Sequence, residues 1–80
     1  MPLVFTIHAS RRLLQRGIAK TWVEATIAAP DWTVPDPVNP QLTRAFKRLP
    51  EAGGRVLRVV YLKEQDDFVI ITAFLDRNAG

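Results

Sequence analysis

His8 is the only histidine of the 80-residue chain. Three of the eleven basic residues follow it within eight positions, namely Arg11, Arg12 and Arg16. On a helix, at about 100° per residue, one face would hold His8, Arg11, Arg12 and Gln15. An imidazole beside guanidinium groups could act on a phosphate, because the ring accepts protons near neutral pH and the cations stabilise negative charge. The same side chains could equally be a solvated helix face, and the pattern does not distinguish the two.

Metal-free cleavage of RNA is the reaction that these residue types would suit. It needs a base for the 2′-hydroxyl, an acid for the leaving oxygen and cations on the phosphate. His8 is the candidate base, because the dipole at a helix N-terminus disfavours the charged imidazolium. Tyr61 is the second candidate catalytic residue, as acid or phosphate donor. The candidate RNA-binding residues are Arg11, Arg12, Arg16 and Arg55.

Each of these assignments has a structural alternative. His8 could be a cap or a packing residue where a strand meets a helix. Arg55 could form a cross-strand ion pair with Asp76. Other chemistries fit the chain less well: with one histidine and no cysteine we expect no metal site and no cofactor. A single serine makes a Ser-His-Asp triad implausible.

The charge of the chain is concentrated in two segments. The net charge is +3, and residues 1–30 and 44–63 are strongly basic, whereas residues 31–43 and 64–80 are acidic. We expect the two basic segments to converge on one surface, which would be the footprint of a polyanion binder such as an RNA-binding protein. A soluble basic protein without such a partner is the alternative.

The hydrophobic pattern predicts one domain over residues 1–80. Residues 3–7 are short, apolar and β-rich, and therefore predict a first strand. Helices are expected over residues 8–16 and 20–29, with Gly17 as a left-handed residue after the first and Pro30 ending the second. The proline-rich segment 30–40 is expected to be a loop with a short extended piece at residues 32–34.

Three strands are expected in the second half, over residues 42–49, 55–63 and 68–75. The first is polar enough for a sheet edge, and the other two form an apolar central hairpin. The order β-α-α-β-β-β predicts an α+β two-layer sandwich, in which two helices cover one face of an antiparallel sheet.

The two faces of the hairpin differ in character. We expect the more aliphatic face to pack on the helices; it consists of Val56, Arg58, Val60, Leu62, Val69, Ile71, Ala73 and Leu75. The other face is then the exposed working surface, with Arg55, Leu57, Val59, Tyr61, Ile70, Thr72 and Phe74. This arrangement assumes that Tyr61 lies opposite Ile70, Val59 opposite Thr72, and Arg55 opposite Asp76.

The chain resembles a bacterial and phage family, the domains of unknown function numbered 4258. The resemblance rests on Phe5-Thr6-x-His8-Ala9-x-x-Arg12-x-x-x-Arg16-Gly17-Ile18, a helix ending at Pro30-Asp31, Leu57-Arg58-Val59-Val60 and Val69-x-x-Thr72. That family is considered similar to the RelE/ParE-like toxins, whose element order is the one expected here. The resemblance implies a small bacterial cytoplasmic protein with a site similar to that of a ribonuclease, and His8, Arg12 and Arg16 are the positions that carry over. Ala19 replaces the usual serine after Gly-Ile, which affects helix capping.

The leading hypothesis is therefore an RNA-directed, toxin-like domain that binds RNA and could cleave it without metal. The alternative is a protein-interaction module that pairs with an antitoxin-like protein or forms a homodimer. A third hypothesis, a ParE-like inhibitor of DNA topoisomerase, needs no catalytic histidine. The start Met-Pro-Leu-Val-Phe predicts neither a signal peptide nor a membrane span.

Overall fold

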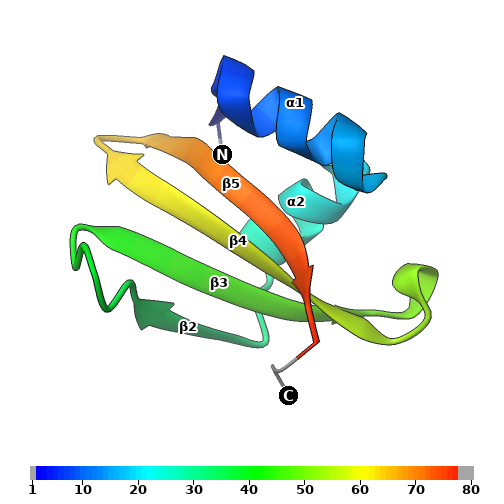
Figure 1. Ribbon diagram of the computed structural model, residues 1–80. Coiled ribbons are helices and arrows are strands. Elements are labelled where there is room, and N and C mark those ends of the chain that lie inside the picture. The colour runs from blue at the N-terminus through cyan, green and yellow to red at the C-terminus, as the bar shows by residue number, and fades with distance from the viewer. Residues whose placement is uncertain (1, 78–80) are drawn as a thin grey trace.

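The computed structural model describes residues 2–77, which form two helices and a five-stranded sheet (Figure 1). The strands are β1 (Leu3–Phe5), β2 (Trp32–Pro35), β3 (Leu42–Leu49), β4 (Arg55–Glu64) and β5 (Asp67–Asp76). The helices are α1 (Ile7–Arg16) and α2 (Lys20–Ala28), and a short 3-10 helix, η1 (Pro50–Ala52), precedes β4. The α+β class and the two predicted helices are confirmed.

The sheet is mixed rather than antiparallel, with the strand order β1-β5-β4-β3-β2. β1 pairs with β5 in parallel, and the other neighbours are antiparallel. β1 and β5 can run in parallel because both helices and three strands separate them in the chain, so no tight turn constrains their direction. The expected edge position of β3 is wrong, because residues 32–35 form the edge strand β2 beside it.

Local sequence signals set the ends of α1. The side-chain oxygen of Thr6 accepts a hydrogen bond from the Ala9 N–H at 3.0 Å and so caps the first turn. Gly17 has the left-handed φ of 65°, and its N–H is directed to the carbonyl oxygens of Leu13 and Leu14. The helix therefore ends at the predicted glycine, and α2 begins without a side-chain cap at Ala19, also as predicted.

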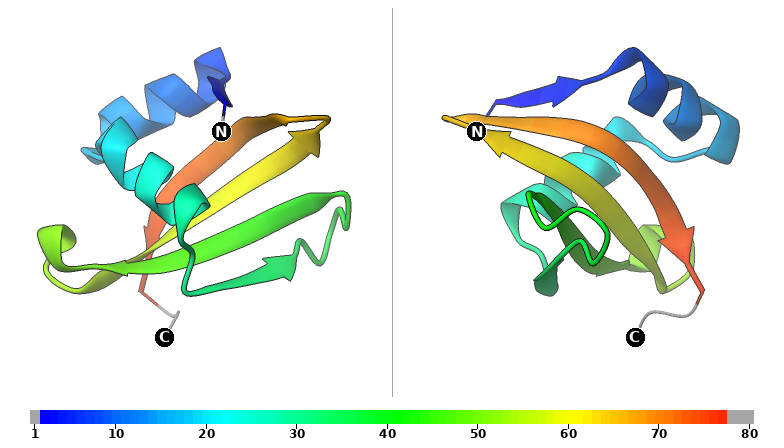
Figure 2. Two further views of the ribbon diagram at one scale, coloured as in Figure 1. Left: turned by 180° about the vertical axis from the view of Figure 1, so that it is seen from behind. Right: turned by 60° about the vertical axis from the view of Figure 1, so that its left-hand side comes forward.

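Both helices lie on one side of the sheet, and the other side is free of helices (Figure 2). α1 leaves β1 and continues along β5, while α2 crosses β4 and β3. The core between the two layers consists of apolar side chains from both helices and from β1, β3, β4 and β5, including Ala9, Leu13, Val23, Leu57 and Ile70. Thr26 is also fully buried there, and its hydroxyl donates to the Trp22 carbonyl oxygen at 2.8 Å, so that its polar group is satisfied.

The predicted assignment of the hairpin faces is wrong for β4 and for the first part of β5, whereas the later part of β5 faces as expected, with Thr72 and Phe74 outside and Ala73 and Leu75 toward the helices. Leu57 and Val59 are fully buried under the helices, and Tyr61 packs against the same core. The face that carries Arg58 is the outer one. Arg58 lies in the middle of β4, where helices above it would bury its charge, whereas Arg55 at the end of the strand reaches solvent.

A register shift between Val60 and Tyr61 changes the cross-strand partners in the second half of the hairpin. Tyr61 lies opposite Ile70 as expected, but Val59 lies opposite Ala73 and Val56 opposite Asp76. The extra residue of a β-bulge moves all later side chains of a strand to the other face. As a result Thr72 and Phe74 share the outer face, and Ala73 and Leu75 face the helices.

The outer face carries a continuous row of aromatic and arginine side chains, which we call the outer row: Trp32, Phe46, Arg58, Phe74 and Arg16. The Trp32 and Phe46 rings stack with their centroids 4.9 Å apart and their planes at 8°. The Arg58 guanidinium lies 5.8 Å from the centroid of Phe46 and 4.3 Å from that of Phe74, and Arg16 lies 5.6 Å from Phe74. The row thus runs from the β2 edge to α1.

Candidate nucleic-acid interface

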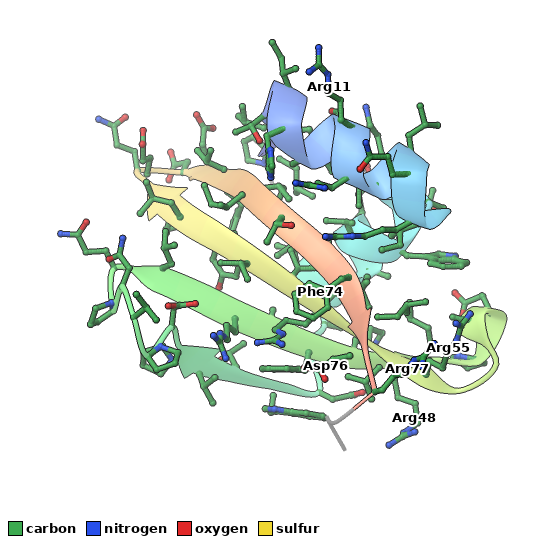
Figure 3. The ribbon with its side chains drawn as sticks, in the orientation of Figure 1. Arg11, Arg48, Arg55, Phe74, Asp76 and Arg77 are labelled. Atoms are coloured by element: carbon green, nitrogen blue, oxygen red, sulfur yellow. The ribbon has the colours of Figure 1, made fainter. Side chains whose placement is uncertain are left out.

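Four arginines converge at the end of the sheet where β4 begins and β5 ends. One hollow of about 220 Å³ is lined by Arg48, Arg55 and Arg77, and a second of about 300 Å³ by Arg16, Arg55 and Arg77. The two hollows adjoin, since both include Arg55, Leu75 and Arg77. We call Arg16, Arg48, Arg55 and Arg77 the arginine cluster. Figure 3 shows three of its side chains, Arg48, Arg55 and Arg77, gathered at the end of β5.

Three guanidiniums of the arginine cluster are held in place by backbone carbonyl oxygens. Arg16 Nη1 donates to Ala73 O at 2.9 Å, Arg48 Nη1 to Gly54 O at 2.7 Å, and Arg55 Nε to Ala52 O at 2.8 Å. Each guanidinium has five N–H donors, so these bonds orient it and leave donors for an anion. Orientation before binding reduces the side-chain entropy lost when a ligand is held.

The acidic side chain beside the arginine cluster is neutralised within the fold. Asp76 lines the first hollow, and its Oδ2 lies 2.9 Å from Arg58 Nη2 on the neighbouring strand. The predicted position of Arg55 opposite Asp76 is therefore wrong, because the register shift places Val56 opposite Asp76, which pairs with Arg58. The arginine cluster keeps an excess of positive charge around both hollows.

Backbone amides do not contribute to this site. Gly53 and Gly54 have the left-handed φ values of 70° and 79°, but their N–H groups bond to Pro50 O and Leu49 O. The Gly-Gly pair is thus a turn that brings Arg55 back toward the sheet. Its two N–H groups are therefore not available to bind a phosphate.

His8 lies on the exposed side of α1, in its first turn. Its Nε2 accepts from Arg12 Nε at 3.4 Å, and Arg12 Nη1 donates to Gln15 Oε1 at 3.3 Å. These contacts form a solvated row on the helix, as the periodicity predicts. Because α1 rises about 1.5 Å per residue, His8 lies roughly 12 Å along the helix from Arg16 and the arginine cluster.

The other predicted site residues occupy separate places. Tyr61 is partly buried on the helix-facing side, with its ring 5.3 Å from that of Phe68, and it forms no hydrogen bond to His8 within the described residues. Arg11, in the middle of α1, points away from the arginine cluster (Figure 3). Of the predicted residues, the fold therefore brings together Arg16 and Arg55, but not His8 and Tyr61.

Sequence reasoning missed Arg48 and Arg77. Arg48 belongs to the second basic segment, and its strand position on the face of Phe46 was available from the alternation of residues 42–49. Arg77 lies in an acidic segment, and nothing in its sequence neighbourhood indicates the site. It reaches the arginine cluster because β5 ends beside the start of β4.

Asp36 is the described side chain whose titration departs most clearly from normal. Its pKa is lowered, mainly by the hydrogen bond from the Asn39 N–H, together with those from the Val38 N–H and Arg44. It organises the loop between β2 and β3, away from the arginine cluster. Residues 2–77 contain no group of three or more His, Asp or Glu side chains placed to hold a metal ion. No helix in that range is long and apolar enough to cross a membrane.

Comparison with known proteins gives one match. The family model described as "Domain of unknown function (DUF4258)" matches residues 5–75, so the chain belongs to that family. No curated protein matches the chain, and no solved structure matches it.

Proposed function

We propose that this member of the DUF4258 family binds RNA, and that the arginine cluster holds the phosphate backbone. The observation that carries the proposal is the anchoring of Arg16, Arg48 and Arg55 on backbone carbonyl oxygens around two adjoining hollows. Oriented guanidiniums match the geometry of phosphate oxygens and bind them through paired N–H donors. An excess of positive charge in a concave site also attracts polyanions over a distance.

The test is RNA binding measured by fluorescence anisotropy as a function of salt. Affinity should fall between about 50 and 200 mM salt, with a log–log slope of about −0.7 for each phosphate contacted in a single strand. Arg55→Gln should weaken binding and reduce the slope, because Arg55 lines both hollows. Arg11→Gln removes the same charge from the middle of α1, where the side chain points away from the arginine cluster, and is the matched control. Equal effects of the two substitutions would contradict the proposed site.

Cleavage of the bound RNA is a separate part of the proposal. His8 remains the candidate general base, with Arg12 beside it as the candidate phosphate contact. Because His8 lies roughly 12 Å along α1 from Arg16, it would act on a different phosphate of the same strand from those held by the arginine cluster. Tyr61 is a weaker candidate acid, since its ring packs against Phe68 and the core.

We further propose that the domain is similar to the RelE/ParE-like toxins and acts in the cytoplasm. The support is the order of two helices followed by the antiparallel strands β3, β4 and β5. The additional strand β2 lies between α2 and β3 in the chain, and β1 pairs in parallel with β5. An RNA-directed toxin would need the phosphate-binding surface described above.

A second candidate function is protein interaction. Large apolar side chains are exposed along β1 and α1: Val4 is 44%, Ile7 74% and Leu14 85% exposed. Ile7 and Leu14 are seven residues apart and therefore lie on one side of α1. This stripe favours contact with a partner protein, such as an antitoxin, or with a second copy of the chain. Light scattering after gel filtration would test self-association, which Leu14→Glu should abolish.

A further inference from the structure

We infer that the RNA-binding site prefers single-stranded RNA, because Trp32 provides a stacking surface for a base next to the arginine cluster. This inference rests on the proposed function and adds the class of RNA. The key relationship is between Trp32 on β2 and Arg48 on β3. Both side chains lie on the outer face of the sheet, on neighbouring strands.

The register brings the indole close to the arginine cluster. Trp32 lies opposite Phe46, and Arg48 follows Phe46 by two residues on the same face. Such diagonal neighbours have Cα atoms about 7–8 Å apart. The residue that precedes β2 is also hydrogen-bonded to Arg48, because the Arg48 N–H donates to Asp31 Oδ2 at 2.8 Å. A nucleotide with its phosphate at Arg48 would therefore have its base within reach of Trp32.

The indole is held in a fixed orientation with one face available. Phe46 covers its inner face, with the two rings almost parallel at 8°. β2 is the edge strand of the sheet, so within residues 2–77 no further strand covers the opposite face, and Trp32 is 37% exposed. Phe46 in turn packs under the Arg58 guanidinium, which is paired with Asp76. The indole is thus supported by the outer row and does not need to reorganise to receive a base.

Base stacking on Trp32, beside a phosphate held by Arg48, favours single-stranded RNA over a duplex. Any base can stack on an aromatic ring, whereas the bases of a duplex are already stacked and paired inside the helix. A duplex could still bind the arginine cluster through its phosphates, but it would gain nothing from Trp32. The indole should therefore add affinity for single-stranded RNA alone.

The experiment compares a single-stranded RNA of about ten nucleotides with a duplex of the same sequence. Trp32→Leu should weaken single-strand binding by about 5- to 150-fold, the range expected for one stacked base. Duplex affinity should stay the same. Trp32→Phe, which keeps an aromatic ring, should recover much of the loss. Unchanged single-strand affinity of Trp32→Leu would overturn the inference, as would an equal loss for both forms of RNA.

A second measurement keeps the test independent of the stability of Trp32→Leu. The chain has two tryptophans, so Trp22→Phe leaves Trp32 as the only indole fluorophore. Single-stranded RNA should quench its emission, and the duplex should not. Absence of quenching while single-stranded RNA is bound would overturn the inference. If Arg55→Gln abolishes binding while every Trp32 measurement is unaffected, the proposed function stands and the preference for single strands falls.

Discussion

The guanidinium of Arg16 is bonded to the backbone of Ala73, with Nη1 2.9 Å from the carbonyl oxygen. This bond joins the last residue of α1 to β5. β1 pairs only with residues 68–70 of β5, so the continuation of that edge is covered by α1 instead. Arg16 therefore has two roles: it satisfies a carbonyl group of β5 and it presents its remaining donors to the second hollow.

Replacing Arg16 should lower both stability and RNA affinity. Arg16→Gln loses the bond to Ala73 O, and we expect the free energy of unfolding to fall by about 1 kcal/mol. Urea denaturation measures this change. Arg12→Gln is the matched control, because among residues 2–77 the hydrogen bonds of the Arg12 side chain go to exposed side chains of its own helix. Equal stability losses would show that the bond to β5 contributes nothing specific.

His8→Ala should leave the fold intact. His8 is exposed and makes one long hydrogen bond, so the change in stability should stay within about 0.5 kcal/mol, which is a few degrees in Tm. If the protein cleaves RNA, the rate should fall on the order of a hundredfold or more, while RNA affinity is unchanged. Turnover and melting are measured on the same samples. A variant that cleaves at the original rate would exclude His8 as the base.

Leu57→Ala should strongly destabilise the domain. Leu57 is fully buried between β4 and the helices, and truncation of such a leucine costs about 2–5 kcal/mol. Leu14→Ala is the matched control, since Leu14 is 85% exposed and its truncation should change stability by less than about 0.5 kcal/mol. The denaturant midpoints of the two variants measure the difference in their stability. Similar midpoints would mean that the helices do not cover this face of β4.

Asp36 should make the stability of the domain sensitive to acid. Hydrogen bonds from Asn39 and Val38, with Arg44 nearby, lower its pKa in the folded state. When the pKa of a carboxyl group is lower in the folded state than in the unfolded chain, its ionisation stabilises the fold at pH values above the unfolded pKa. This stabilisation is lost as pH falls through the folded pKa. The free energy of unfolding should thus decrease below about pH 4. Asp36→Asn should reduce this decrease, whereas Asp66→Asn in the exposed hairpin turn should not. Identical pH profiles for Asp36→Asn and the unmodified chain would refute the linkage.

The sequence by itself determined the local elements. Helical spacing of Ala9 and Leu13, the left-handed glycine at Gly17 and the proline after α2 are short-range signals, and the helices begin and end within about one residue of the prediction. The apolar content of β4 and β5 likewise indicated a central hairpin. These features depend on the conformation of a few neighbouring residues, which is why the chain alone predicts them.

Tertiary structure decided which elements meet and which faces are covered. The parallel pairing of β1 with β5 and the edge position of β2 depend on contacts between distant segments. The register shift at Val60 and Tyr61 put Thr72 and Phe74 on the face opposite to that of Leu57 and Val59, and one residue of slip is enough to do so because side chains alternate along a strand. The arginine cluster has the same origin: Arg16, Arg48, Arg55 and Arg77 come from four segments, and only the folded sheet brings their charges around one site.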